Sequence, residues 1–187
     1  MHSEIIVIDG FYANPDQQRD YALGLSYDYT GNYPGKRTTS DPSECEQIKP
    51  HIEKILGLKV INWSAEQSGM SNGAYQICVK DDKETWIHAD KTDWSCMVYL
   101  SPAPPKHSGI CFYEHDKTGK RYYDKEDGPY LEDEGQQWDK WSLTDEIQNI
   151  YNRAVFFRGH LWHCAAQPYF GDSLETGRLF QTFFFDV

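Results

Sequence analysis

The residues best suited to chemistry lie in the segment ETWIHADKTDW, residues 84–94. His88 and Asp90 stand two residues apart, and side chains alternate between the faces of a strand, so both project to the same side together with Trp86. An imidazole and a carboxylate that converge in this way suit a divalent metal ion. Because a single His-x-Asp pair is more often a surface pair or a satisfied hydrogen bond, the metal hypothesis needs a third ligand.

Candidate third ligands occur in the later segment GHLWHC. His160 and His163 are three residues apart and point to opposite faces of an extended strand, so at most one of them easily joins the pair. The other is then structural. A histidine here would complete a facial triad with open coordination positions, the arrangement of non-haem Fe(II) oxygenases.

An arginine stands inside the aromatic segment GRLFQTFFFDV near the end of the chain. Thr182 follows Arg178 by four residues, so both lie on one face of a strand. Burying an unpaired charge is costly, so Arg178 must have an anionic partner or lie at the edge of the sheet. That partner is either one of the chain's own carboxylates or a bidentate carboxylate ligand.

These side chains need a scaffold, and the composition indicates one β-rich domain. The 187 residues suffice for a single core, and 13 Tyr, 9 Phe and 6 Trp favour sheet. β-like runs occupy 58–63, 73–80, 85–90, 94–101 and 108–115, and two more strands are expected near the C-terminus. The predicted fold is mainly β, a double-stranded β-helix (a cupin-like jelly roll) of about eight strands with N-terminal helices packed outside.

Helices are expected chiefly in the first 60 residues. The first begins at the N-cap Asn14 with Pro15 at its first position. The second runs through DPSECEQIKPHIEKILGL, where Pro50 should kink or divide it. Residues 1–60 are therefore predicted to be a helical support for a jelly-roll core over residues 70–187.

Residues 116–141 are polar, acidic and glycine-containing, which predicts a loop insertion within the single domain 1–187. Such an insertion is either a solvated surface loop or a lid over the substrate. A short helix is expected to follow over residues 142–152, with Ser142 or Thr144 as its cap.

The charge balance limits the partners. With 18 Lys plus Arg against 29 Asp plus Glu, the net charge of −11 disfavours nucleic-acid binding. The start MHSEIIVIDGF has a short apolar run without a basic region, which predicts neither a signal peptide nor a membrane span. Five singly spaced cysteines indicate reduced thiols and a cytoplasmic location. The expected partner is a peptide or small-molecule substrate, and the sequence leaves the oligomeric state open.

In their order along the chain, these segments resemble the Fe(II)/2-oxoglutarate-dependent dioxygenase superfamily, especially its prolyl-hydroxylase-like branch. The resemblance covers about residues 70–187. The letters HAD match the family's HxD motif, and WHC fits its distal histidine. CMVYLS looks like the strand that carries the cosubstrate tyrosine, SGICFY is similar to a glycine-containing strand that begins at Gly109, and RLFQT matches an Arg and a Thr four residues apart.

The resemblance implies a role for each matched residue. Fe(II) would be held by His88, Asp90 and His163, the last preferred to His160 because of the family-like gap after the Phe pair. 2-Oxoglutarate would be bound by Arg178 at its distal carboxylate, with Tyr99 and Thr182 as hydroxyl donors. With O2, the implied reaction hydroxylates a C–H bond of a prolyl, peptidyl or small amino-acid-like substrate and releases succinate and CO2. The gap between His163 and Arg178 is longer than usual, which predicts a looped-out turn.

Two other functions remain open. A Zn-dependent hydrolase would use the same ligands and a metal-bound water, but would have no need for Arg178. A non-catalytic jelly-roll binding module would retain the ligands for stability. Within the oxygenases, the nucleic-acid demethylase branch is disfavoured because RLFQTF lacks that branch's second arginine and the chain is acidic. Of Trp86, Trp94 and Trp162, one is expected to line a pocket and two to lie in the core.

Overall fold

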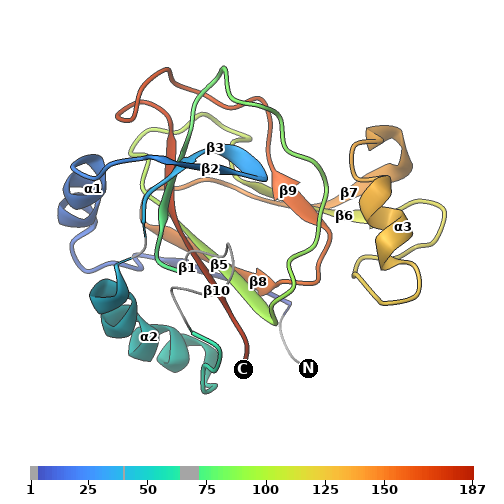
Figure 1. Ribbon diagram of the computed structural model, residues 1–187, viewed down its shortest axis with the longest axis horizontal. Helices are drawn as coiled ribbons and strands as arrows, with labels where there is room; N and C mark the ends of the chain where they lie inside the picture. The colour runs from blue at the N-terminus through green and yellow to red at the C-terminus, as the bar shows by residue number, and fades with distance from the viewer. Residues whose placement is uncertain (1–3, 40, 64–71) are drawn as a thin grey trace.

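The computed structural model describes residues 4–39, 41–63 and 72–187. Its framework is two antiparallel sheets (Figure 1). The larger sheet has seven strands in the spatial order β1 (Ile5–Asp9), β8 (Arg153–Arg158), β5 (Trp94–Tyr99), β10 (Arg178–Phe185), β4 (Tyr75–Cys78), β3 (Tyr33–Arg37) and β2 (Tyr29–Gly31). The smaller sheet has three: β7 (Trp141–Ile147), β6 (Ile110–His115) and β9 (His163–Ala165).

The chain passes repeatedly from one sheet to the other. After β4 in the larger sheet, residue His88 forms an isolated bridge to His163 at the margin of the smaller one. The chain then enters β5 in the larger sheet, β6 and β7 in the smaller, β8 in the larger, β9 in the smaller and β10 in the larger. This alternation brings segments far apart in sequence to the same interior. The expected strand at 85–90 is thus an extended segment with a single bridge.

Strand β10 shows how the larger sheet divides the molecule into two faces. Its odd-numbered residues, among them Leu179 and Phe183, are buried in clusters that also contain residues of the helices. Its even-numbered residues from Arg178 to Phe184 line a cavity instead. Because side chains alternate along a strand, the same eight residues supply both core and cavity wall.

Two helices pack on the face of the larger sheet that points away from the cavity. Ala22 of α1 (Pro15–Leu23) and Ile52 of α2 (Pro42–Leu56) are fully buried in these clusters. The predicted Asn14 cap forms, since its side chain accepts a hydrogen bond from the Gln17 N–H at 3.3 Å. The expected break at Pro50 was wrong, because α2 runs through it. Burial of the apolar face of α2, at about 1.5–3 kcal/mol per large side chain, offsets a proline cost of about 3 kcal/mol.

Local sequence signals were misleading in two further places. The first 60 residues contribute strands β1, β2 and β3 to the larger sheet in addition to the helices. The helix expected over residues 142–152 was wrong, because Trp141–Ile147 forms β7 and pairs with β6. Its apolar positions fit both a helical and an alternating period, and the backbone ladder to β6 decides between them.

The insertion at 116–141 is folded and partly buried. It contains α3 (Gly128–Asp133) and the short 3-10 helix Trp138–Lys140. Leu131 is fully buried in a cluster with Ile87 and Trp162, and the Gly135 carbonyl accepts a hydrogen bond from the Ile87 N–H at 3.0 Å. Glu132 reaches the edge of the cavity. Part of the insertion therefore packs against the extended segment that carries Ile87 and His88, and other parts of it are exposed.

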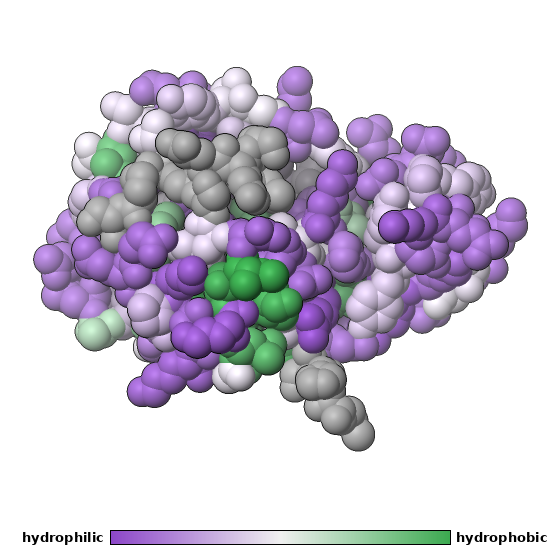
Figure 2. Space-filling view, turned by 60° about the horizontal axis from the view of Figure 1, so that its bottom comes forward, coloured by the Kyte–Doolittle hydropathy of each residue, from purple (hydrophilic) through white to green (hydrophobic). Residues whose placement is uncertain are grey.

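One face of the molecule is mostly hydrophilic with one compact apolar patch (Figure 2), and the thiols are buried. All five cysteines are buried and free, as expected for thiols that pack as small apolar groups. Among the described residues, no helix has the length and apolar character needed to cross a membrane.

Candidate active site

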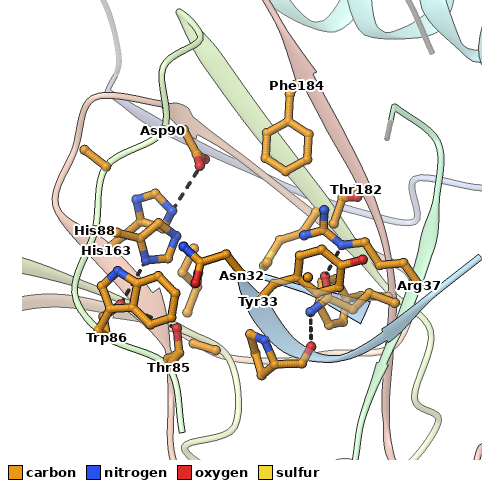
Figure 3. A pocket seen from close by; sticks show the side chains of 18 of the residues that line it. Asn32, Tyr33, Arg37, Thr85, Trp86, His88, Asp90, His163, Thr182 and Phe184 are labelled. Atoms are coloured by element: carbon orange, nitrogen blue, oxygen red, sulfur yellow. Dashed lines mark hydrogen bonds and ion pairs between the residues drawn. The ribbon is translucent and has the colours of Figure 1, made fainter. Parts of the chain in front are cut away.

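A cavity of about 800 Å³ lies against the inner face of the larger sheet (Figure 3). Both sheets contribute to its wall, and the β2–β3 hairpin contributes a third side. Five of the six residues singled out as ligands in the sequence line it: His88, Asp90, His163, Arg178 and Thr182. The fold thus brings metal-ligand and anion-binding candidates to one space.

Three potential ligand atoms converge at one end of the cavity. Nitrogen or oxygen atoms of His88, Asp90 and His163 all lie within 4.8 Å of one another. His163 Nε2 is 3.5 Å from Asp90 Oδ2, and the two imidazole centroids are 4.6 Å apart. No other such group of three occurs in the described part of the chain. Two neutral imidazoles and a carboxylate are a donor set that suits a borderline divalent metal.

The backbone fixes the tautomer of both histidines. His88 Nδ1 lies 2.9 Å from the Trp86 carbonyl and His163 Nδ1 lies 2.7 Å from the Leu161 carbonyl. A carbonyl only accepts, so each Nδ1 carries the proton and donates it. Each Nε2 then keeps its lone pair, which is the form required of a metal ligand.

The protonation state of His163 also suits a metal ligand. Burial lowers its pKa to about 4, and the neighbouring His88 adds to this effect while Asp90 opposes it. At neutral pH the His163 imidazole is therefore uncharged. No proton has to leave it before a metal binds.

Asp90 is held by contacts that the sequence did not reveal. Ser95 Oγ donates a hydrogen bond to Asp90 Oδ2, and the Asp90 N–H donates to the Gly159 carbonyl at 2.7 Å. A Cβ at residue 159 would lie only 2.1 Å from the Thr92 carbonyl oxygen, so this close approach requires glycine. His160 stands outside the triad, with its Nδ1 3.1 Å from the Asp90 carbonyl. Of the two candidate histidines, the fold therefore brings His163 to the ligand cluster.

Arg178 lies in the central strand β10 and is 1% exposed. Its Nε and one Nη each donate a 3.0 Å hydrogen bond, to the carbonyls of Ser108 and Gly109. The guanidinium also lies 4.4 Å from the Phe180 ring centroid. None of the ion pairs among the described residues includes Arg178, so neither the expected internal salt bridge nor an edge position accounts for it. These carbonyls accept from two of its five N–H groups and do not neutralise its charge, which leaves the cavity wall positively charged and N–H donors free for a ligand.

Of the two hydroxyl candidates, Tyr99 lies beside this guanidinium but is not among the residues that line the cavity, whereas Thr182 lines it. Tyr99 is fully buried, the Arg178 guanidinium is 5.4 Å from its ring centroid, and its Oη makes no hydrogen bond of standard geometry among the described residues. Burial raises the pKa of Tyr99 to about 12, with Arg178 opposing the shift. Thr182 lines the cavity and donates a long 3.4 Å hydrogen bond to the Ala74 carbonyl. A buried hydroxyl without a partner beside an unneutralised guanidinium is a site prepared for an oxyanion.

The expectation for the three tryptophans is confirmed. Trp86 lines the cavity, whereas Trp94 and Trp162 lie in separate core clusters. Sequence reasoning missed Ser95, although it lies four residues before Tyr99 on the same strand face. It also missed Arg37 and the rest of the hairpin wall, because YPGKR carries no alternating pattern.

Several solved structures are similar to this chain in fold. HygX from Streptomyces hygroscopicus, solved with nickel and 2-oxoglutarate bound, is similar at a TM-score of 0.61 and 10% identity, over 97% of this chain and 82% of HygX. The Fe(II)/α-ketoglutarate-dependent dioxygenase TqaL is similar at a TM-score of 0.52 and 12% identity, over 97% of this chain and 82% of TqaL. IDO from Bacillus thuringiensis is similar at a TM-score of 0.51 and 9% identity, over 97% of this chain and 93% of IDO. At such identities these likenesses show a shared fold.

Sequence comparison is more limited. No functionally curated protein matches the chain. One family profile covers nearly all of it, matching residues 1–185, and is described as a family of unknown function. On that match the chain belongs to DUF6445.

Proposed function

We propose that the protein is a non-haem Fe(II)- and 2-oxoglutarate-dependent dioxygenase of the prolyl-hydroxylase-like branch, built on a double-stranded β-helix, that hydroxylates a C–H bond of a peptidyl or small amino-acid-like substrate. One observation carries the proposal. The ligand atoms of His88, Asp90 and His163 lie within 4.8 Å of one another, in the cavity that Arg178 also lines. The alternation of the chain between two sheets supports the proposed fold.

The residues present fit both proposed cofactors. Fe(II) would be held by the two imidazole Nε2 atoms and the Asp90 carboxylate, a facial donor set that leaves coordination positions open. The distal carboxylate of 2-oxoglutarate would meet the guanidinium of Arg178, the unpaired hydroxyl of Tyr99 and the hydroxyl of Thr182. The bound iron and cosubstrate supply the oxidising chemistry: substrate, 2-oxoglutarate and O2 give hydroxylated substrate, succinate and CO2.

The chain's own contribution is positioning. Backbone carbonyls of Trp86 and Leu161 hold the histidine rings, and Ser95 holds the carboxylate of Asp90. Apolar side chains line the cavity between the triad and Arg178 and exclude water: Met97, Ile110, Phe157 and Phe180. No side chain is needed as a general acid or base.

The anion site separates this function from its alternatives. A metal-dependent hydrolase needs no carboxylate-binding guanidinium, whereas Arg178 is fully buried and unneutralised in the same cavity as the triad. A peptide or small molecule is the proposed partner, and the negative net charge of −11 argues against nucleic acid. The buried free cysteines support a reducing compartment such as the cytoplasm.

The test is calorimetry of the purified protein under anaerobic conditions, first with Fe(II) and then with 2-oxoglutarate, followed by succinate measurement after O2 is added. The proposal predicts one metal per chain, 2-oxoglutarate binding that depends on the metal, and succinate formation. Metal binding without 2-oxoglutarate binding would support a hydrolase instead. Binding of both without succinate would support a non-catalytic module.

A further inference from the structure

The cavity contains a second guanidinium, which the proposed iron and 2-oxoglutarate sites leave unused. Arg37 stands at the end of β3 and pairs across the strands with Gln76 of β4, which in turn pairs with Phe180 of β10. Directly opposite residues in a sheet share a face, so Arg37 stands on the inner face with Phe180. Arg178 occupies the preceding inward position of β10. Two cations from different strands therefore line one cavity.

The Arg37 guanidinium is held through its Nε, and its two terminal nitrogens are not part of that contact. Its Nε donates a 2.7 Å hydrogen bond to Gln76 Oε1, and the Gln76 amide nitrogen is fixed by the Pro34 carbonyl, also at 2.7 Å. The guanidinium lies 3.8 Å from the Tyr33 ring centroid and 5.9 Å from that of Phe184. These contacts fix the plane of the guanidinium at the cavity wall. Among the described residues, its two terminal nitrogens have no hydrogen-bond acceptor.

The chain does not neutralise this charge. It has 29 acidic residues against 18 basic ones, yet none of the ion pairs within residues 4–39, 41–63 and 72–187 includes Arg37. Burial lowers the pKa of Arg37, while nearby Tyr33 and Asp90 oppose the shift. A guanidinium removed from water without a carboxylate partner is costly to keep, and an anionic ligand would remove that cost.

The position of Arg37 suits the oxidised substrate rather than the cosubstrate. In Figure 3, Arg37 lies on one side of the cavity and the triad on the other, with Asn32 and Tyr33 of the hairpin between them in that view. Arg178 lies deeper, 1% exposed and beside the unpaired Tyr99 hydroxyl. A ligand held by Arg37 would therefore share the cavity with the triad.

We propose, building on the dioxygenase function above, that Arg37 binds a free carboxylate of the substrate, which makes the substrate a small carboxylic acid of the amino-acid type and not an internal residue of a peptide. The two terminal nitrogens of a guanidinium match the two oxygens of a carboxylate. A carboxylate has the single charge that one arginine neutralises. With Arg178 assigned to 2-oxoglutarate, no further buried cation among the described residues that line the cavity is left for the second charge of a phosphate.

The test uses protein loaded with Fe(II) and 2-oxoglutarate under anaerobic conditions. The probes are the twenty proteinogenic amino acids, the carboxamides of those that bind, and inorganic phosphate, with affinities measured by calorimetry. We expect at least one free acid to bind, its carboxamide to bind at least tenfold more weakly, and phosphate not to displace it.

The variants assign the effect to one side chain. Arg37→Gln is expected to weaken acid binding at least tenfold, to leave carboxamide and 2-oxoglutarate affinities unchanged, and to be partly rescued by Arg37→Lys. The control is Arg153→Gln, which removes a guanidinium that is paired with Asp9 outside the cavity. Thermal melting of each variant checks that the fold is retained.

Four outcomes would overturn the inference: no free acid binds, acid and carboxamide bind equally, phosphate displaces the acid, or Arg37→Gln leaves acid affinity unchanged. A fall in 2-oxoglutarate affinity in Arg37→Gln would make Arg37 a cosubstrate residue and would equally refute it. Failure of the wild-type protein to bind 2-oxoglutarate would instead count against the dioxygenase proposal. The two failures are therefore distinguishable.

Discussion

His88 and His163 face each other across an antiparallel bridge and exchange both backbone hydrogen bonds, at 3.0 and 2.9 Å. The separation of their rings is thus set by the sheet and not by a metal. Since Asp90 follows two residues after His88, the bridge also fixes the side from which the carboxylate approaches. A site whose ligands are placed by backbone pairing is preorganised before any ligand binds.

Support for Asp90 by Ser95 leads to a prediction about metal affinity. Removing the hydroxyl in Ser95→Ala leaves one carboxylate oxygen without its donor, and loss of such a supporting contact typically weakens metal binding by about 10- to 100-fold. The measurement is anaerobic calorimetry with Fe(II). The matched control is Ser101→Ala, another buried serine near the end of β5, whose Oγ donates to the Gly177 carbonyl away from the triad. Equal Fe(II) affinity in both variants would refute the role of Ser95.

Arg178 is predicted to determine 2-oxoglutarate affinity but not metal affinity. Losing charge-assisted hydrogen bonds of about 1.5–3 kcal/mol in Arg178→Gln should weaken 2-oxoglutarate binding by about 10- to 100-fold. Calorimetry of the Fe(II)-loaded protein measures it, and Arg153→Gln serves as the surface control. Because Arg178 is buried, unchanged Fe(II) binding is the evidence that the variant still folds. A folded variant with wild-type 2-oxoglutarate affinity would exclude Arg178 as the anchor.

The insertion should respond to acid through Glu134. The hydrogen bond from Lys140 lowers the pKa of Glu134 to about 2, and His115 and Tyr130 contribute in the same direction. A carboxyl group whose folded pKa is depressed contributes stability above its unfolded pKa, near 4.5, and loses it as pH falls toward 2. The melting temperature of the wild type should therefore fall more steeply between pH 5 and pH 3 than that of Glu134→Gln. Parallel curves for the two proteins would contradict this assignment.

Metal removal provides a prediction that separates the two candidate histidines. At a metal concentration of about 100 times Kd, binding contributes about 2.7 kcal/mol, which corresponds to a rise of about 5–11 °C in Tm for a chain of this size. Chelation should reverse the rise. His163→Ala should abolish it, whereas His160→Ala should retain most of it, because the His160 imidazole hydrogen-bonds to the Asp90 carbonyl and lies outside the ligand cluster. A rise that survives in His163→Ala and is lost in His160→Ala would exchange their roles.

The sequence predicted which side chains converge in the cavity better than it predicted the elements around them. His88 and Asp90 follow from the two-residue period of a strand alone, and that parity holds in the structure even though the segment forms a single bridge. The preference for His163 depended on family-like spacing, because its proximity to His88 is a tertiary contact between residues 75 positions apart. Arg178 was predicted to need an anion, and the finding that two of its donors are met by the Ser108 and Gly109 carbonyls required coordinates.

Strands β1, β2 and β3 were not predicted from the sequence, because they depend on pairing with distant segments. β1 forms because the IIVID segment pairs with β8, some 150 residues away, and an apolar run of that length carries no sign of its partner. The β2–β3 hairpin contains YPGKR, whose proline and glycine argue against a strand, yet it closes the cavity and supplies Arg37. Such elements are stabilised by their neighbours and not by local propensity.

The central claim is that three residues make an iron site at which 2-oxoglutarate is decarboxylated. The most direct measurement is succinate formed per chain after O2 is added to anaerobic protein loaded with Fe(II) and 2-oxoglutarate, for the wild type and for His88→Ala, Asp90→Ala and His163→Ala. The account predicts Fe(II)-dependent succinate from the wild type and its loss in each variant. Wild-type protein that yields no succinate, or any of the three variants with wild-type yield, would contradict it.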